Sequence, residues 1–250
     1  GVRGAKSMVD AKVLDGVNYL ISGHIGLKAD KSGQIVCGTK GFLATSKIIA
    51  NFKGKASHAG AAPEKGDNAL LSAACAVLNL HSIPRNSKGA TRINVGKLIS
   101  GTASNIIPEN AYMEIETRGE TNDLNDYMKN YAERILHSAA QMHDTKLNIE
   151  YGGQAESAES SDDLMKTVKK SALKIYNPNL IIDKKINFGA SEDISYMMNK
   201  VQSNGGQAAY LMFGSNLKSP NHSSNFDFNE ADLINAVKLY SILVLDINHK

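Results

Sequence analysis

The chain has 250 residues, which suits one large domain or two modest ones and leaves ample apolar material for a core. Its 28 Lys and Arg stand against 25 Asp and Glu and are spread along the sequence, so the clustered basic stripe that nucleic-acid binding needs is lacking. The two cysteines, Cys37 and Cys75, have no C-x-x-C spacing, and they indicate neither a disulfide framework nor a thiolate metal site. A cytoplasmic protein without a nucleic-acid partner is expected.

Membrane and export signals are absent from the pattern. No apolar stretch approaches the ~20 residues of a membrane span, and no leader with charged, apolar and small-residue regions opens the sequence. We therefore expect neither a membrane partner nor export. The chain begins at Gly1, and the segment GVRGAKSMVDA predicts a helix already under way. This start indicates the C-terminal part of a longer polypeptide.

Apolar periodicity predicts an α/β chain. A short helix over 5–11 and a buried strand, VNYLIS, come first, with His24 just past the strand. Strict alternation over 42–53 predicts a half-buried antiparallel strand. Helical spacing then predicts a helix over 67–81, whose apolar stripe consists of Leu70, Leu71, Ala74, Val77 and Leu78.

The next elements complete one recognisable unit. Strands over 92–99 and 111–118, a helix over 122–142 and a strand over 146–151 follow. The order strand, helix, strand, strand, helix, strand predicts a ferredoxin-like α+β unit over 41–152.

A second domain surrounds this unit. The loop GGQAESAESSDD marks a return to other structure, followed by a helix over 162–176, a helix start at Ser191, the strand AAYLMFG and a final helix over 229–245. Residues 1–40 and 153–250 are therefore expected to form one discontinuous α/β domain.

Two histidines are candidate metal ligands. His24 follows one apolar strand, and His222 lies in the loop NHSSNFDFNE after another. Ligands collect at the carboxyl ends of strands in open α/β sheets, so the two imidazoles could share one site. A pair of hydrogen-bonded loop histidines explains the same pattern.

Three further residues are candidates for catalysis or substrate binding. His58 lies among small residues in KASHAGAAPEKGDNAL, where it could donate a hydrogen bond to a developing oxyanion or be a plain turn histidine. Asn105, in SGTASNIIPENAYMEIETRG, could cap its turn or contact a ligand. Arg118 could clamp a substrate carboxylate or pair with Glu114 or Glu116 on its own strand.

Acidic residues at a helix start have an ordinary explanation. Glu192 and Asp193 follow Ser191 at a predicted helix N-terminus, where the helix dipole favours negative charge. Helix capping is the interpretation that their position favours.

The segments GKASHAGAAPEKGDNAL, SGTASNIIPENAYMEIETRG, FGASEDISYMM and NHSSNFDFNE resemble the dinuclear-metal aminoacylase and carboxypeptidase family, in its amidohydrolase branch. The resemblance covers essentially the whole chain, with the motifs in order. It implies a partial catalytic domain like that of zinc exopeptidases, and an inserted ferredoxin-like lid that dimerises. It also implies a homodimer through the lid, and a second, related type of chain is a further candidate partner.

The same resemblance implies roles for residues. His24 and His222 correspond to ligands of two divalent ions, zinc or manganese, and His58 to the lid histidine that reaches a partner's active site. Asn105 and Arg118 correspond to the residues that hold the substrate's amide and free carboxylate, while Gly189 shapes the pocket floor. The family's upstream half, with its glutamate pair and further ligands, has no counterpart in this sequence.

The expected reaction of the complete protein is hydrolysis of an amide to an amino acid, with p-aminobenzoyl-glutamate as the expected substrate. This chain by itself is expected to be inactive. The alternatives are a non-catalytic oligomerisation or substrate-binding module, and a deacylase of N-acyl-amino acids.

Overall fold

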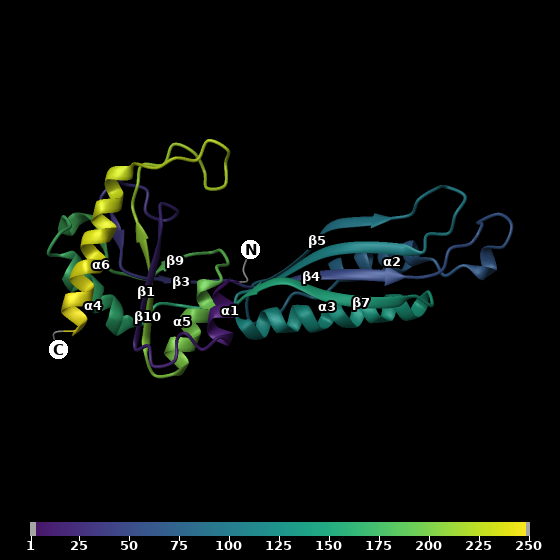
Figure 1. The fold of residues 1–250 in the computed structure, drawn as a ribbon, viewed down its shortest axis with the longest axis horizontal. Coiled ribbons are helices and arrows are strands. Elements are labelled where there is room, and N and C mark those ends of the chain that lie inside the picture. Colours follow the sequence, from purple (N-terminus) through teal and green to yellow (C-terminus); the bar gives the residue numbers. More distant parts are fainter. Residues whose placement is uncertain (1–3, 249–250) are drawn as a thin grey trace. The chain divides into compact units, whose positions relative to one another are not determined.

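The computed structural model describes residues 4–248, and the chain forms two compact units (Figure 1). The inserted unit comprises residues 43–157, and the outer unit comprises residues 4–42 together with the chain from 158 onward. The limits of the inserted unit thus lie two and five residues beyond those of the expected 41–152. Residues 1–3 and 249–250 of the predicted discontinuous domain lie outside the described residues.

The inserted unit has the ferredoxin-like order that the sequence predicts. Its elements are β4 (Ala44–Lys53), α2 (Ala69–His81), β5 (Thr91–Ser100), β6 (Asn110–Gly119), α3 (Asn122–Met142) and β7 (Lys146–Ala155). The sheet order is β5-β6-β4-β7, and every neighbouring pair is antiparallel. Asn68 and Thr121 start the two helices, because their side chains accept hydrogen bonds from first-turn amides, such as that of Leu70 at 3.0 Å.

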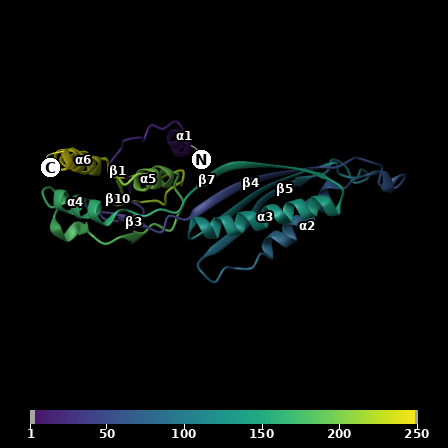
Figure 2. The ribbon, with the colours of Figure 1, turned by 90° about the horizontal axis from the view of Figure 1, so that it is seen from below.

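Both helices of this unit cover one face of its sheet (Figure 2). Alternate residues of β4, such as Ile48 and Phe52, point into the core between sheet and helices. Met113 and Ile115 of β6 do the same, while the residues between them face the open side. The sheet therefore has one face packed and one face available for function.

The apolar stripe predicted for α2 was wrong. The helix instead buries its small side, and Leu71 and Leu78 are 48% and 75% exposed. Small side chains allow a helix to approach the sheet closely, so the sequence ALLSAACAVLNLH is apolar on two sides and its periodicity does not decide which side packs. The residues that pack are Ala69, Ser72, Ala73, Ala76 and Leu80.

The outer unit is built around β10 (Gln207–Phe213). The sheet order is β1-β10-β2-β8, formed by β1 (Tyr19–Ile25), β2 (Ile35–Val36) and β8 (Ile181–Ile182) beside it. β1 and β10 are parallel, and β10 and β2 are antiparallel. A separate pair consists of β3 (Thr39–Lys40) and β9 (Ile186–Asn187).

Helices cover both faces of β10. Ala209, Leu211 and Phe213 pack against α4 (Asp162–Ala172) and α6 (Leu233–Asn248). Ala208, Tyr210 and Met212 pack on the other face, where α5 (Ile194–Ser203) supplies Met198. This arrangement explains why AAYLMF is a continuous apolar run. The remaining helix is α1 (Gly4–Asp10), which lies against α5.

Several predicted limits change in the structure. Phe42 does not belong to β4: its ring packs on Phe188, with centroids 4.6 Å apart, in the core of the outer unit. His24 lies inside β1 rather than past its end. The predicted helix over 162–176 ends at Ala172, and the one expected from Ser191 begins at Ile194. The final helix, predicted over 229–245, is preceded by a short 3-10 turn and extends to Asn248.

No helix within residues 4–248 is long and apolar enough to cross a membrane. Cys37 is buried, and this burial raises the pKa of its thiol to about 12, so the group stays protonated at neutral pH. A structural role for Cys37 follows.

Candidate functional site

His58 and Asn105 lie on adjacent loops at one end of the inserted sheet. A backbone bridge joins His58 to Ile106, and the amide of Ala59 donates to the carbonyl of Asn105 at 3.0 Å. The amide of Ile107 donates to the carbonyl of Ser57 at 2.9 Å. Both His58 and Asn105 are exposed. The structure therefore brings together two residues that are 47 positions apart in the sequence.

The hydrogen bonds of His58 select one tautomer. The backbone amides of Gly60 and Ala61 donate to its Nδ1 at 3.2 and 3.1 Å, and an amide donor requires a lone pair on that nitrogen. In the neutral ring the proton therefore resides on Nε2. Its N–H is the donor that the loop leaves for another molecule.

The tight turn after His58 explains why this segment is rich in small residues. The hydroxyl of Ser57 donates to the carbonyl of Ala62 at 2.5 Å, and the amides of Ala61 and Ala62 donate to the carbonyl of His58 at 3.3 and 3.0 Å. Sequence reasoning missed the amides of Gly60 and Ala61 as functional groups. The signal was present in SHAGAAP, since Gly and Ala let the backbone fold back onto the imidazole.

Arg118 lies at the other end of β6 and forms an ion pair on its own strand. Its Nε donates to Glu116 Oε2 at 2.8 Å, and the two side chains are 37% and 31% exposed. The ion pair that the sequence left open as an alternative is thus formed. It uses one of the five guanidinium N–H groups, so a carboxylate clamp is compatible with it.

One inserted unit does not bring Arg118 to His58 and Asn105. Eight residues of extended β6 separate Arg118 from Asn110, where the loop carrying Asn105 joins the strand. At ~3.3 Å per residue this is a separation of roughly 26 Å. A small amide that contacts His58 cannot reach Arg118 of the same inserted unit.

His24 has the hydrogen bond that is typical of a metal-binding histidine. Its Nδ1 lies 2.7 Å from the carbonyl oxygen of Ile25, which can only accept, so Nδ1 carries the proton and Nε2 keeps its lone pair. His222 is exposed in the loop after β10, with a φ of 67°.

These histidines do not complete a metal centre. Within residues 4–248, no group of three or more His, Cys, Asp or Glu side chains is placed to hold an ion. The ligand set on the described residues is thus short of what a two-metal site needs.

The segment from Gly189 to Asp193 enters α5. Gly189 has a φ of 69°, a conformation that favours glycine, and its amide donates to the carbonyl of Gly41 at 3.1 Å. The capping predicted for Asp193 differs in its target: its Oδ2 accepts from the amide of Ala5 at 3.1 Å, in the first turn of α1. Glu192 accepts the hydroxyl of Ser195 at its backbone carbonyl, 2.8 Å away.

Comparisons with known proteins agree with the motifs. Residues 38–143 match the model of the peptidase dimerisation domain of the M20 family. The chain is 39% identical to indole-3-acetyl-aspartic acid hydrolase of Enterobacter agglomerans, over 98% of this chain and 56% of that protein. It is 40% identical to one of the chains of p-aminobenzoyl-glutamate hydrolase of Escherichia coli (strain K12), over 95% of this chain and 54% of that protein.

The fold also has a solved counterpart. The crystal structure of an aminobenzoyl-glutamate utilization protein from Klebsiella pneumoniae superposes with a TM-score of 0.86 and 35% identity, covering 98% of this chain and 58% of that one. The chain therefore spans little more than half the length of the relatives it matches. The predicted resemblance is confirmed, and the chain belongs to the M20 peptidase family, with the dimerisation domain of that family at residues 38–143.

Proposed function

We propose that this chain is part of a metal-dependent amidohydrolase that releases an amino acid from an acyl or aryl amide, with p-aminobenzoyl-glutamate as the first substrate to test. The observation that carries the proposal is the pair formed by His58 and Asn105 on adjacent exposed loops, with His58 Nε2–H available as a donor. The similarity to hydrolases of aromatic acyl derivatives of Asp and Glu supports it.

His58, Asn105 and Arg118 would bind and polarise the substrate. His58 Nε2–H would donate to the oxyanion that develops on the scissile carbonyl, and a preorganised donor of this kind commonly contributes about 10²–10³ in kcat. The Asn105 side chain would hold the amide region. Arg118 would hold the free carboxylate through guanidinium nitrogens that the ion pair with Glu116 does not use.

Such a site needs two copies of the inserted unit. Because roughly 26 Å separates Arg118 from the loop of Asn105, one substrate could contact His58 and Asn105 of one copy and Arg118 of another. The exposed Leu71 and Leu78 of α2 and the exposed Ile99 of the edge strand β5 support a homodimer formed by this unit. A related chain of a second type is the alternative partner.

Two divalent ions, zinc or manganese, would supply an activated water in the complete protein. His24 and His222 are our candidate ligands here, and the Nδ1 contact of His24 with Ile25 fits that role. Since the described residues do not complete the site, the roles proposed above are limited to binding and polarisation. Gly189 is a candidate for the pocket floor, and a reducing cytoplasm is our proposed location.

The same exposed leucines favour a second candidate function, an oligomerisation or substrate-binding module without catalysis. Metal analysis and a substrate panel separate the two. The 250-residue chain should bind metal weakly and hydrolyse neither p-aminobenzoyl-glutamate nor N-acetyl-amino acids. A longer protein with the additional residues of its relatives should hold about two ions per chain and cleave the aromatic amide. Failure of the longer protein to hydrolyse any of these amides would leave the module as the function.

A further inference from the structure

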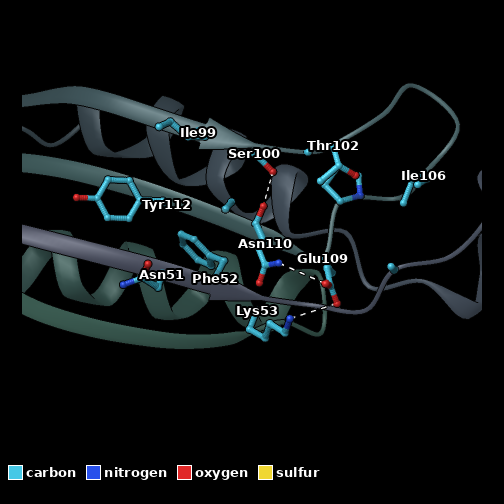
Figure 3. A pocket seen from close by; sticks show the side chains of 14 residues that line it. Asn51, Phe52, Lys53, Ile99, Ser100, Thr102, Ile106, Glu109, Asn110 and Tyr112 are labelled. Atoms are coloured by element: carbon cyan, nitrogen blue, oxygen red, sulfur yellow. Dashed lines mark hydrogen bonds and ion pairs between the residues drawn. The ribbon is translucent and has the colours of Figure 1, made fainter.

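A hollow of about 660 Å³ opens where β4, β5 and β6 meet the loop that carries Asn105 (Figure 3). Its size is in the range of small-molecule pockets, roughly 300–1,000 Å³. Ile99, Ile106, Pro108 and Tyr112 contribute apolar walls, and Asn51 and Thr102 are among the polar residues that line it. In Figure 3, Tyr112 and Ile106 lie toward opposite ends of this hollow.

The hollow adjoins the proposed catalytic histidine. Ile106, which lines it, is the residue bridged to His58, and Asn105 immediately precedes Ile106. A molecule that accepts a hydrogen bond from His58 could therefore extend a neighbouring group into the hollow.

Tyr112 is held in place although it is partly exposed. Its hydroxyl donates to Glu114 Oε1 at 2.6 Å, and Lys97 Nζ lies 5.3 Å from the ring centroid. Lys97 also lies 3.4 Å from the same carboxylate oxygen. The hydrogen bond to Glu114 raises the pKa of Tyr112, so the phenol remains a donor. A ring fixed in advance loses less conformational freedom when a ligand packs on it.

The charge of the lining indicates which part of a substrate fits. Among the described residues that line the hollow, the charged ones are Lys53 and Glu109, and their side chains pair at 3.2 Å. A neutral, partly apolar hollow favours an uncharged aromatic group over the carboxylates of an amino acid.

We propose that this hollow binds the aromatic acyl group of the substrate, with Tyr112 as the ring against which that group packs. The assignment rests on the proposed amide hydrolysis, because it gives the acyl end of the substrate a place beside His58. It makes Tyr112 and Ile99 determinants of acyl-group specificity, whereas Arg118 acts on the amino-acid end.

Direct binding to the 250-residue chain tests the assignment without turnover. We would titrate p-aminobenzoyl-glutamate and N-acetyl-glutamate, which share their carboxylates and differ in the acyl group, and follow the tyrosine ring signals by NMR. The aromatic compound should bind more tightly and shift the Tyr112 signals. Equal binding of both compounds, or no change at Tyr112, would overturn the proposal.

Matched variants make the test specific. Tyr112→Ala should weaken binding of p-aminobenzoyl-glutamate about tenfold, the size expected for losing an aromatic contact and its apolar burial. Tyr151→Ala is the control, because Tyr151 is a 40% exposed tyrosine of the same sheet that also contacts a glutamate, Glu133. Ile99→Thr is a second variant, useful if Tyr112→Ala fails to fold. Unchanged affinity in a folded Tyr112→Ala or Ile99→Thr variant would contradict the assignment.

The longer protein separates this proposal from the reaction itself. Tyr112→Ala should lower kcat/KM for the p-aminobenzoyl substrate about tenfold while leaving the N-acetyl substrate nearly unchanged. An equal loss for both substrates would overturn the acyl site and leave the amidohydrolase assignment intact. Absence of hydrolysis by the unmodified longer protein would overturn the proposed function, whereas the binding difference would remain as an independent result. Protection of the hollow by a second copy, seen as binding that fails in the dimer and appears in the monomer, would also contradict an acyl site.

Discussion

The two units of this chain cover their sheets to different degrees. The inserted unit encloses one continuous core between its four strands and two helices, and it presents its candidate residues on ordered loops and strand ends. In the outer unit, β10 is buried on both faces, but its neighbour β1 is half-exposed along its length, and α6 exposes Ile234, Val237 and Val244. Parallel strands are usually covered on both faces.

This difference explains what each unit contributes to a site. The loops of His58 and Asn105 are already bonded to one another, so the inserted unit carries a formed part of the proposed centre. The outer unit carries His24 with its ring oriented, but the described residues do not complete a ligand set around it. The described residues therefore carry groups for substrate recognition but not a complete set for metal chemistry.

Two buried phenylalanines test whether the units are separate. Phe42 and Phe52 are 0% and 1% exposed and lie in the cores of the outer and inserted units, respectively. Each change to alanine should cost about 3–5 kcal/mol of stability. Hydrogen exchange should show faster opening of the outer unit in Phe42→Ala and of the inserted unit in Phe52→Ala. Loosening of β4 by Phe42→Ala would instead support a strand that begins at Phe42.

His58→Ala tests the formed part of the site in the longer protein. Loss of the Nε2–H donor should lower kcat by roughly 10²–10³ and leave the metal content unchanged. His137→Ala is the control, since His137 is an exposed histidine on α3 of the same unit. Metal loss would mean that His58 is a ligand, and an unchanged kcat would mean that it is a turn histidine.

The exposed side of α2 tests whether the inserted unit joins a second copy. Burying a leucine is worth about 1.5–3 kcal/mol, so Leu71→Asp and Leu78→Asp should each raise the dimer dissociation constant roughly tenfold or more. Leu173→Asp, at a 48% exposed leucine of the outer unit, is the control. Light scattering at high micromolar concentration is the measurement. A monomer in the unmodified protein at that concentration would contradict the proposed dimer.

The sequence predicted most of the inserted unit because its signals are local. Alternation placed β4, β5, β6 and β7, and the stripe of Leu124, Met128 and Ile135 placed the packed side of α3. It failed for α2, where small residues pack and leucines are exposed, because a helix that is apolar on two sides has no single stripe. The two-residue strands of the outer unit were missed, since they are too short to show a period.

The candidate site could be predicted by residue type but not by arrangement. The bridge between His58 and Ile106 depends on two loops that are far apart in the sequence, and no local pattern encodes their contact. The tautomer of His58 depends on the direction of two backbone amides, which only the folded turn defines. Arg118 was left between clamp and ion pair because both use the same side chain, and the structure shows that the ion pair forms.

Arg118→Lys in the longer protein tests the end of the inserted unit that lies farthest from His58. Guanidinium can grip both oxygens of a carboxylate, whereas ammonium offers a point charge with different reach. If Arg118 clamps the substrate, kcat/KM for substrates with a free carboxylate should fall about tenfold, the loss expected for one charge-assisted hydrogen bond. The matching amide-capped substrates should change much less.

Glu116→Gln is the control for the ion pair, because it removes the carboxylate that Arg118 Nε contacts at 2.8 Å and keeps the guanidinium. An exposed pair of this kind contributes about 0–1 kcal/mol to stability, so Glu116→Gln should leave the ratio of the two kcat/KM values unchanged. If Arg118 serves only that pair, Arg118→Lys will also leave the ratio unchanged, and the carboxylate must be held elsewhere. A selective loss in Arg118→Lys alone would identify the guanidinium as the clamp.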